Sequence, residues 1–149
     1  MAATGLNTGN FDLSFTSPAA ASTVAQTAVT GMGPFTSGYL CCTLTGATGG
    51  VLDIYIQISP DGGASWFDYL HFAQLAAGAA AVTKVVAISK KIPTTTAITT
   101  AGTGTSPALA ANTVIGGDWG DRMRILAVAG ASTSAGAAQV IKFIASSQV

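Results

Sequence analysis

The chain has 149 residues, and its formal net charge at pH 7 is zero because six basic residues balance six acidic ones. Only 8% of the residues are charged, against about 25% in an average soluble domain, while 49% are hydrophobic. The length predicts a single domain with its own core. Zero net charge argues against nucleic-acid binding, which needs a basic face to neutralise phosphates.

The shortage of charged residues also bears on the surface of the protein. A monomer with so few charges has little to keep its surface solvated and its copies apart. Charge depletion with retained aromatic residues is typical of the centre of a protein–protein interface. We therefore expect partner proteins to cover part of the surface, and Thr, Ser, Asn and Gln to keep the remainder polar.

Residues 1–10 are rich in Gly, Asn, Ala and Thr and show no hydrophobic pattern. We expect them to form an N-terminal arm that a neighbouring molecule orders, followed by a single β-sandwich domain over residues 11–149. The first residues lack the basic and apolar regions of a signal peptide, and no segment resembles a membrane span. We therefore expect synthesis in the cytoplasm and no membrane partner.

Segments that alternate apolar and polar residues, and that are rich in Val, Ile, Thr and aromatic residues, predict β-strands. In chain order, the predicted strands span residues 11–15, 23–29, 37–45, 51–59, 66–74, 82–92, 94–100, 122–128 and 140–145. The clearest alternation runs through residues 51–59, where one face carries Leu52, Ile54, Ile56 and Ile58.

Eight to nine short strands with no convincing helix predict an all-β fold. The alanine-rich segment 72–81 lacks a stripe at helical spacing and contains Gly78, so we expect a loop there. A second, longer loop is expected over residues 101–112. An antiparallel β-sandwich of jelly-roll type is the architecture expected from the strand number, and a small barrel is the alternative.

Residues 59–66 read Ser-Pro-Asp-Gly-Gly-Ala-Ser-Trp and predict a tight turn between two strands. Pro60 fixes φ, Asp61 can accept hydrogen bonds across the turn, and the two glycines permit positive φ. The segment resembles the Asp-box of sialidase-like β-propellers, with Ser65 in place of Thr. Those propellers repeat the motif in every blade, whereas it occurs once here. The resemblance therefore implies a hairpin and not a sialidase.

A second resemblance is carried by two segments. Residues 52–69 combine a strand, the Ser-Pro-Asp-Gly turn and a Trp-Phe-Asp-Tyr run, and residues 120–125 read Gly-Asp-Arg-Met-Arg-Ile. In this order they resemble small β-sandwich virion proteins of tailed bacteriophages, closest to capsid decoration (cement) proteins. The resemblance implies a homo-oligomer, dimer or trimer, on the exterior of the capsid. It would bind the major capsid protein and stabilise the assembled head, with its arm adding a strand to a neighbour.

Two other functions remain open. One is a tail, collar or head–tail adaptor protein of the same virion. The other is a carbohydrate-binding module, whose sugar-stacking aromatic residues would be Tyr55, Trp66, Tyr69 and Trp119, exposed on one face. We expect Trp66 to lie in the core instead, on the same face as Asp68. The Asp68 carboxylate then needs a backbone amide or a place at the rim.

Patterns for catalysis and metal binding are weak, and we expect no catalytic, cofactor-binding or metal site. His71 is the single histidine, and a triad with Asp68 and a serine would lack the Gly-x-Ser-x-Gly elbow. One histidine without Cys-x-x-Cys disfavours zinc, and Asp61, Asp118 and Asp121 lack EF-hand spacing. The last two aspartates are expected to shape a turn. We therefore predict a protein that is not an enzyme and has no small-molecule substrate.

The positions of four basic residues suggest roles for them. Arg122 and Arg124 lie on one face of a strand, where they either bind a partner's carboxylate or form a solvated face. Lys90 and Lys91, at the end of a predicted strand, are expected to protect a sheet edge against aggregation.

The two cysteines, Cys41 and Cys42, are adjacent and point to opposite faces of a predicted strand. A disulfide between neighbours is strained, so we expect two small apolar side chains without a mutual bond. An intermolecular bridge and a reactive thiol are the alternatives.

Overall fold

A computed structural model describes residues 6–91 and 102–148 of the chain. Within these residues the protein is all-β, with no helix, and its strands form two antiparallel sheets. The strands are β1 (Leu6–Asp12), β2 (Phe15–Thr16), β3 (Thr23–Ala25), β4 (Val29–Thr30), β5 (Ser37–Leu44), β6 (Leu52–Ser59), β7 (Phe67–His71), β8 (Val82–Ser89), β9 (Thr113–Val114), β10 (Arg122–Ala129) and β11 (Ala138–Gln148). The all-β prediction is confirmed.

The expected count of eight to nine strands is not confirmed, because the described residues contain eleven. The chain interrupts the expected strand 11–15 between β1 and β2, and the expected strand 23–29 between β3 and β4. The short strand β9 had no counterpart among the expected elements. The expected strand 94–100 lies outside the described residues.

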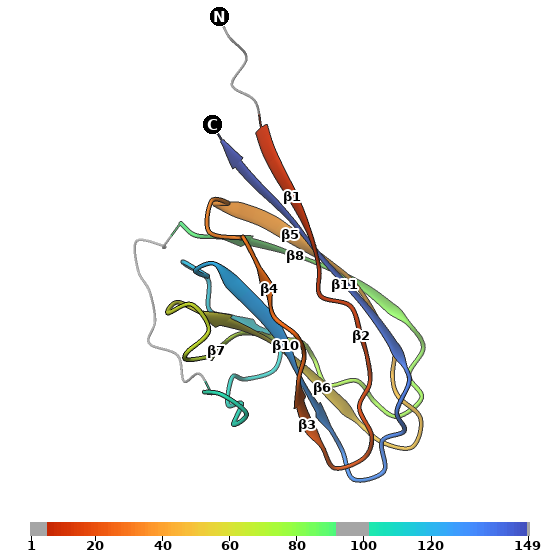
Figure 1. The fold of residues 1–149 in the computed structure, drawn as a ribbon. Coiled ribbons are helices and arrows are strands. Elements are labelled where there is room, and N and C mark those ends of the chain that lie inside the picture. Colours follow the sequence, from red (N-terminus) through yellow and green to blue (C-terminus); the bar gives the residue numbers. More distant parts are fainter. Residues whose placement is uncertain (1–5, 92–101, 149) are drawn as a thin grey trace, which may run out of the picture.

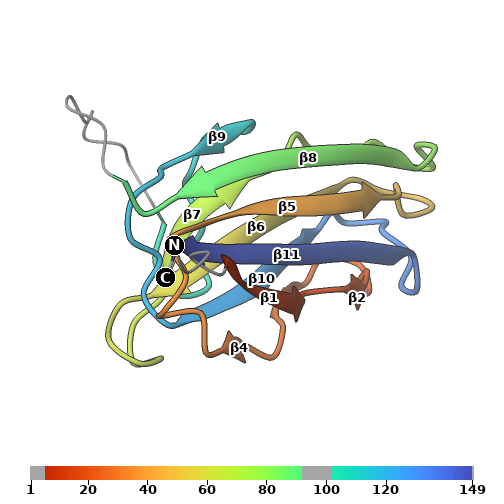
Figure 2. The same cartoon turned by 90° about the horizontal axis from the view of Figure 1, so that it is seen from above.

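Sheet one has the order β1-β11-β5-β8, with β2 also paired to β11. Sheet two has the order β3-β10-β6-β7-β9, with β4 also paired to β10. The two sheets form the two layers of a sandwich-like arrangement (Figure 1). Figure 2 shows β8, β5, β11 and β1 lying side by side in one layer, with β7, β6 and β10 in the other.

Side chains of both sheets meet in one apolar core. The alternation predicted for β6 is confirmed, because Leu52, Ile54 and Ile56 are buried there and Ile58 packs against the cluster. Phe143 of β11 contributes from sheet one and is also fully buried. Because side chains alternate along a strand, this single pattern fixes which face of β6 turns inward.

Trp119 is the largest fully buried side chain in the described residues. Its ring meets Phe143 edge to face, with ring centroids 5.4 Å apart, and its Nε1–H donates to the Met32 carbonyl oxygen at 3.3 Å. Phe143 belongs to sheet one, and Trp119 lies just before β10 of sheet two. This contact therefore links the two layers, and the indole N–H is satisfied inside the core.

A β-bulge in the β6–β7 pair changes the faces predicted from the sequence. Asp68 pairs with Gln57, but Leu70 pairs with the preceding residue of β6, so Tyr69 is an extra residue. Tyr69 and Leu70 both enter the core cluster, whereas Asp68 does not. The expectation that Trp66 and Asp68 share a core face with Leu70 is therefore wrong. Trp66 is only partly buried.

Residues 6–10 of the expected arm form the first part of β1, which pairs with β11 from Leu6↔Gln148 to Asp12↔Lys142. Residues 1–5 lie outside the described residues. The segment 72–81 is a loop, as expected, with one isolated bridge between Leu52 and Leu75. β8 ends at Ser89, shorter than the predicted strand 82–92, and β11 extends beyond both ends of the predicted strand 140–145.

The two tryptophans provide a matched test of this core. We predict that Trp119→Ala lowers the free energy of unfolding by about 3–5 kcal/mol, because it leaves a cavity between the sheets. Trp66→Ala makes the same chemical change outside the core and should cost about 1 kcal/mol. Urea unfolding followed by circular dichroism measures both. Equal losses would contradict the assignment of Trp119 as the core tryptophan.

Candidate functional site

The two segments 52–69 and 120–125, singled out in the sequence, lie side by side at one end of sheet two. β10 pairs with β6, beginning at Arg122↔Ser59, and Gly120 forms a bridge with Ser59. Gly120 has φ +66°, and a Cβ there would lie 2.7 Å from the Ser59 carbonyl oxygen. Only glycine permits this close approach. We call this unit, residues 59–66 and 118–124, the motif end.

Asp61 organises the turn of the motif end. Its Oδ1 accepts the Ser65 N–H at 2.8 Å and the Ser59 hydroxyl at 2.8 Å, and the Ser59 Oγ accepts the Gly63 N–H at 2.7 Å. These hydrogen bonds, the Ser65 amide first, lower the pKa of Asp61 to about 2 because they favour the charged carboxylate. Gly62 and Gly63 have φ values of 74° and 105°. The predicted hairpin turn is confirmed.

Asp68 anchors the loop that crosses the outer face of sheet two. Its Oδ2 accepts the backbone N–H groups of Gly102, Ala108 and Leu109 at 2.9, 2.9 and 3.1 Å, and its Oδ1 accepts the Gln57 Nε2–H at 3.0 Å. Asp68 is 1% exposed. Of the two expected alternatives for its carboxylate, a backbone amide or a place at the rim, the structure shows the first, since a buried carboxylate without donors would be too costly.

Arg124 extends this network toward Trp66. Its Nε–H donates to Gln57 Oε1 at 3.0 Å, its Nη2–H donates to the Gly104 carbonyl oxygen at 3.1 Å, and its guanidinium carbon lies 4.3 Å from the Trp66 ring centroid. Desolvation lowers the pKa of Arg124. The Arg124 guanidinium is therefore engaged in contacts within the chain. Arg122 is partly exposed and, among the described residues, forms no ion pair, so it alone remains a candidate for a partner's carboxylate.

His71 ties the same loop to β6. Its Nδ1 lies 2.8 Å from the Leu109 carbonyl oxygen, its Nε2 lies 3.2 Å from Asp53 Oδ1, and its ring stacks on Tyr55 with centroids 3.8 Å apart. Both ring nitrogens are thus engaged, and the residue is 6% exposed. The triad considered with Asp68 is not formed, because Asp68 bonds elsewhere. The arrangement positions the loop.

A second, smaller core lies under this loop and was not predicted. It consists of Tyr55, Leu109 and Leu126, with partly buried neighbours around them. The signal that could have revealed it is the presence of apolar residues on both faces of β6 and β10, which is typical of strands covered on both sides. The loop expected over residues 101–112 is therefore, in its described part, a cover for sheet two.

Asp118 and Asp121 shape the entry to β10, as expected. Asp118 Oδ1 accepts the Gly120 N–H at 2.8 Å and lies 3.1 Å from Lys90 Nζ, and both contacts lower the pKa of Asp118, the Gly120 amide most. Asp121 Oδ1 accepts the Gly33 N–H at 3.0 Å. Lys90 also donates to the Gly33 carbonyl oxygen at 2.8 Å, so it fixes this loop beyond the end of the edge strand β8. In the described ranges, no three His, Cys, Asp or Glu side chains are grouped to hold a metal ion.

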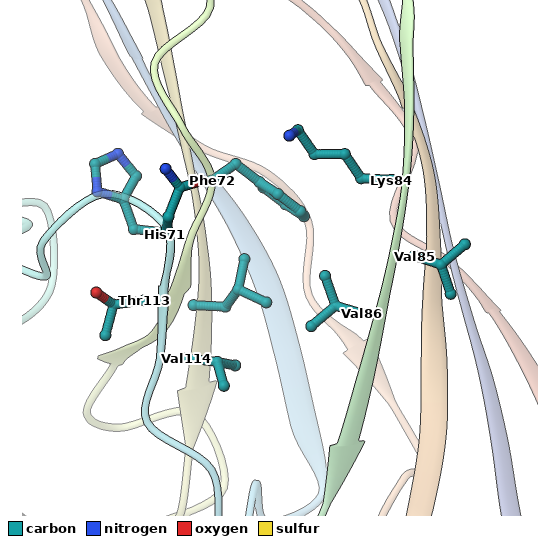
Figure 3. Close-up of a pocket in the computed structure, with 9 residues that line it drawn as sticks. His71, Phe72, Lys84, Val85, Val86, Thr113 and Val114 are labelled. Carbon is teal, nitrogen blue, oxygen red and sulfur yellow. The ribbon is translucent and has the colours of Figure 1, made fainter.

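A cleft of about 370 Å³ opens between β8 and the β7–β9 edge of sheet two. Figure 3 shows Lys84 and Val86 pointing from β8 toward Phe72, while Val85 and His71 point away from this space. The lining is mainly apolar, with Lys84 as its cation. His71 borders the cleft, but its ring nitrogens lie against the Leu109 carbonyl oxygen and Asp53 Oδ1.

The two cysteines are unbonded, Cys42 buried and Cys41 partly exposed. Burial raises the pKa of Cys42 to about 12, which disfavours its reactive thiolate. Cys41 lies on the outer face of sheet one, between Lys142 and Val85 in the strand register.

The four aromatic residues considered for sugar stacking do not form an exposed platform. Trp119 and Tyr69 are fully buried, and Tyr55 is 8% exposed under the second core. Trp66 carries the Arg124 guanidinium over its ring. The aromatic arrangement that a carbohydrate-binding module requires is therefore absent from these four residues.

Comparisons with protein families, with curated proteins and with solved structures find no match to this chain. In the part of the chain that the structure describes, no helix is long and apolar enough to cross a membrane. The function is therefore inferred from the residues and from their geometry.

The anchoring role of Asp68 predicts a local effect of its removal. Asp68→Ala should lower the free energy of unfolding by about 2–4 kcal/mol, because several buried donors lose their acceptor. Hydrogen exchange should accelerate at the amides of Gly102, Ala108 and Leu109. Asp121→Asn, which keeps an acceptor at an exposed site, is the control and should change stability by less than about 0.5 kcal/mol. Unchanged exchange at the three amides in Asp68→Ala would contradict the anchor.

The turn predicts a difference between its two glycines. Gly63→Val should lower the free energy of unfolding by about 1 kcal/mol or more, because valine resists φ +105° and its Cβ would lie 3.2 Å from Arg122 Nη1. Gly62 has φ +74° and open space around it, so Gly62→Asn is the tolerated control. Thermal melts compare the two variants. A melting temperature unchanged by Gly63→Val would show that this conformation is not required.

Proposed function

We propose that this chain is a structural protein of a tailed-bacteriophage virion and decorates the outside of the assembled capsid. In this role it binds the major capsid protein and copies of itself, as a dimer or trimer, and braces the head through protein–protein contacts. It is not an enzyme and uses no cofactor or small-molecule substrate. The observation that carries the proposal is the outer face of sheet one, which has almost no charge.

This face is formed by alternate residues of β1, β11, β5 and β8. Aligned by the strand register, its members are Thr8, Asn10 and Asp12 on β1, then Val140, Lys142, Ile144 and Ser146 on β11. They continue with Ser37, Tyr39, Cys41 and Thr43 on β5, and end with Thr83, Val85, Ala87 and Ser89 on β8. Only Asp12 and Lys142 are charged, and they form an ion pair with each other. Hydrogen bonds from Lys142 and Ser14 hold the pKa of Asp12 well below its ordinary range.

An antiparallel sheet that faces water usually alternates apolar residues inward with polar or charged residues outward. Here the outward positions carry hydroxyl and apolar side chains instead. Such a face suits burial against protein better than exposure to solvent, because few charges need to be desolvated. This face contributes to the low charge of the whole chain, and a role in a shell of packed subunits explains both.

We also infer a jelly-roll topology from the order of the strands. Taking β1 with β2 as one strand and β3 with β4 as another leaves eight principal strands, and β9 is an addition. Numbered 1 to 8 along the chain, they have the order 1-8-3-6 in sheet one and 2-7-4-5 in sheet two. The neighbours 1–8, 2–7, 3–6 and 4–5 are those of one long hairpin folded over on itself. This order supports a jelly roll, an architecture found in viral capsid proteins.

The alternatives are separated by position and by ligand. A tail, collar or head–tail adaptor protein would occupy another place on the particle. A carbohydrate-binding module is disfavoured by the burial of Tyr55, Tyr69 and Trp119. Engagement of both His71 ring nitrogens supports a role without catalysis.

Binding to heads tests the proposed function directly. Purified protein mixed with empty heads of the phage that encodes it should sediment with them and reach saturation, and cryo-electron microscopy should place it on the capsid exterior. Density on the tail or collar would favour the adaptor interpretation. Protein that stays in the supernatant but binds sugars on a glycan array would overturn the structural role and favour the carbohydrate-binding module.

A further inference from the structure

We propose that the outer face of sheet one is the surface through which two copies of this chain pair, each presenting the same patch to the other. The inference rests on the proposed function in one respect: that function includes self-association, and the outer face of sheet one is the surface inferred for it. Three properties of the face itself support this pairing: its exposed apolar side chains, its charge and its area.

The exposed apolar side chains gather on this face. Among the described residues, seven large hydrophobic side chains are exposed, and four of them lie here: Tyr39 at 55%, Val85 at 63%, Val140 at 44% and Ile144 at 44%. Tyr39 pairs with Ile144 on one side and Ala87 on the other, so the patch runs across β11, β5 and β8. Figure 3 shows Val85 pointing away from the cleft between the sheets, toward this outer side. Exposed apolar side chains gathered on one face in this way favour an interaction site there.

The charge of the face favours a second copy as the occupant. A contact between identical patches places every group of the face near a group of the same face. A strongly charged face would repel itself, but here the Asp12–Lys142 ion pair leaves no net charge. The same neutrality gives an acidic or basic partner nothing to recognise. The face is therefore complementary to itself and to no charged surface.

The size of the face is sufficient for a specific dimer. Four strands about 4.8 Å apart, each about eight residues long at about 3.4 Å per residue, cover roughly 500 Å². Two copies would then bury about 1,000 Å², which is near the lower limit for a specific interface. β5 pairs without a break along β11 on one side and β8 on the other, so the centre of the face is regular. Small side chains such as Cys41, Ala87 and Thr83 between the larger ones permit sheets to pack about 10 Å apart.

A charge placed on the face tests the pairing. Sedimentation velocity over a concentration series should show a dimer for the wild type, and Val85→Lys should weaken that dimer by at least about tenfold. Val114→Lys makes the same change at a side chain of 40% exposure on β9 of sheet two, and it should dimerise like the wild type. Val85→Lys could also act by altering the β8 edge. Ile144→Lys places the charge on β11 of the same face, and it should weaken the dimer as well. Melting temperatures verify that each variant is folded.

The Cys41 thiol gives an independent readout of the same surface. Cys41 lies on the face, whereas the Cys42 thiol is buried and its pKa is raised, so maleimide should label Cys41 in the folded protein. Labelling should slow as the wild-type concentration rises, and this dependence should disappear in Ile144→Lys. A wild type that stays monomeric, a trimer, or Val85→Lys and Ile144→Lys variants that still dimerise would overturn the inference.

These outcomes are distinguishable from a failure of the proposed function. A wild type that dimerises through this face but does not bind heads leaves the pairing surface in place and refutes the decoration role. Binding to heads by a chain that never dimerises supports the decoration role and refutes the pairing surface.

Discussion

The buried carboxylate of Asp68 holds the loop that covers the outer face of sheet two, and the rest of the structure depends on this anchor. Its four hydrogen bonds fix the loop from Gly102 to Leu109 across sheet two. Under that loop, Tyr55, Leu109 and Leu126 make a second core, and His71 secures its far end. Because three backbone amides of the loop converge on this one side chain, the loop is held in one position without a large apolar area of its own.

Sheet one has no such cover within the described residues, and the asymmetry explains the unusual composition. The inner faces of both sheets pack on each other, and the outer face of sheet two is closed by the chain itself. The outer face of sheet one is left with exposed apolar side chains and one ion pair. A neutral composition is consistent with a molecule that completes its burial by assembling with other subunits. The proposed roles in capsid decoration and in pairing both follow from this one difference between the sheets.

The sequence predicted the parts of the fold that local patterns control. The alternation from Leu52 to Ile58, the turn around Asp61 and the need of Asp68 for amide partners all follow from neighbours in the chain. The bulge at Tyr69 could not be predicted, because inserting one residue leaves no local signal yet reverses the face of everything that follows. For this reason Trp66 was expected in the core, which Trp119 occupies instead. The backbone donors to Asp68 lie 34 to 41 residues away, so the position of the loop depends on tertiary contacts that no short pattern encodes.

We propose that another molecule covers the outer face of sheet one, whereas the chain's own loop covers the outer face of sheet two. Methyl nuclear magnetic resonance with a soluble paramagnetic probe tests this most directly, because the probe broadens only side chains that solvent reaches. The account predicts that the methyl signals of Val85, Val140 and Ile144 lose their broadening as protein concentration rises, while Val114 remains broadened throughout. Equal broadening of all four residues at every concentration would contradict it.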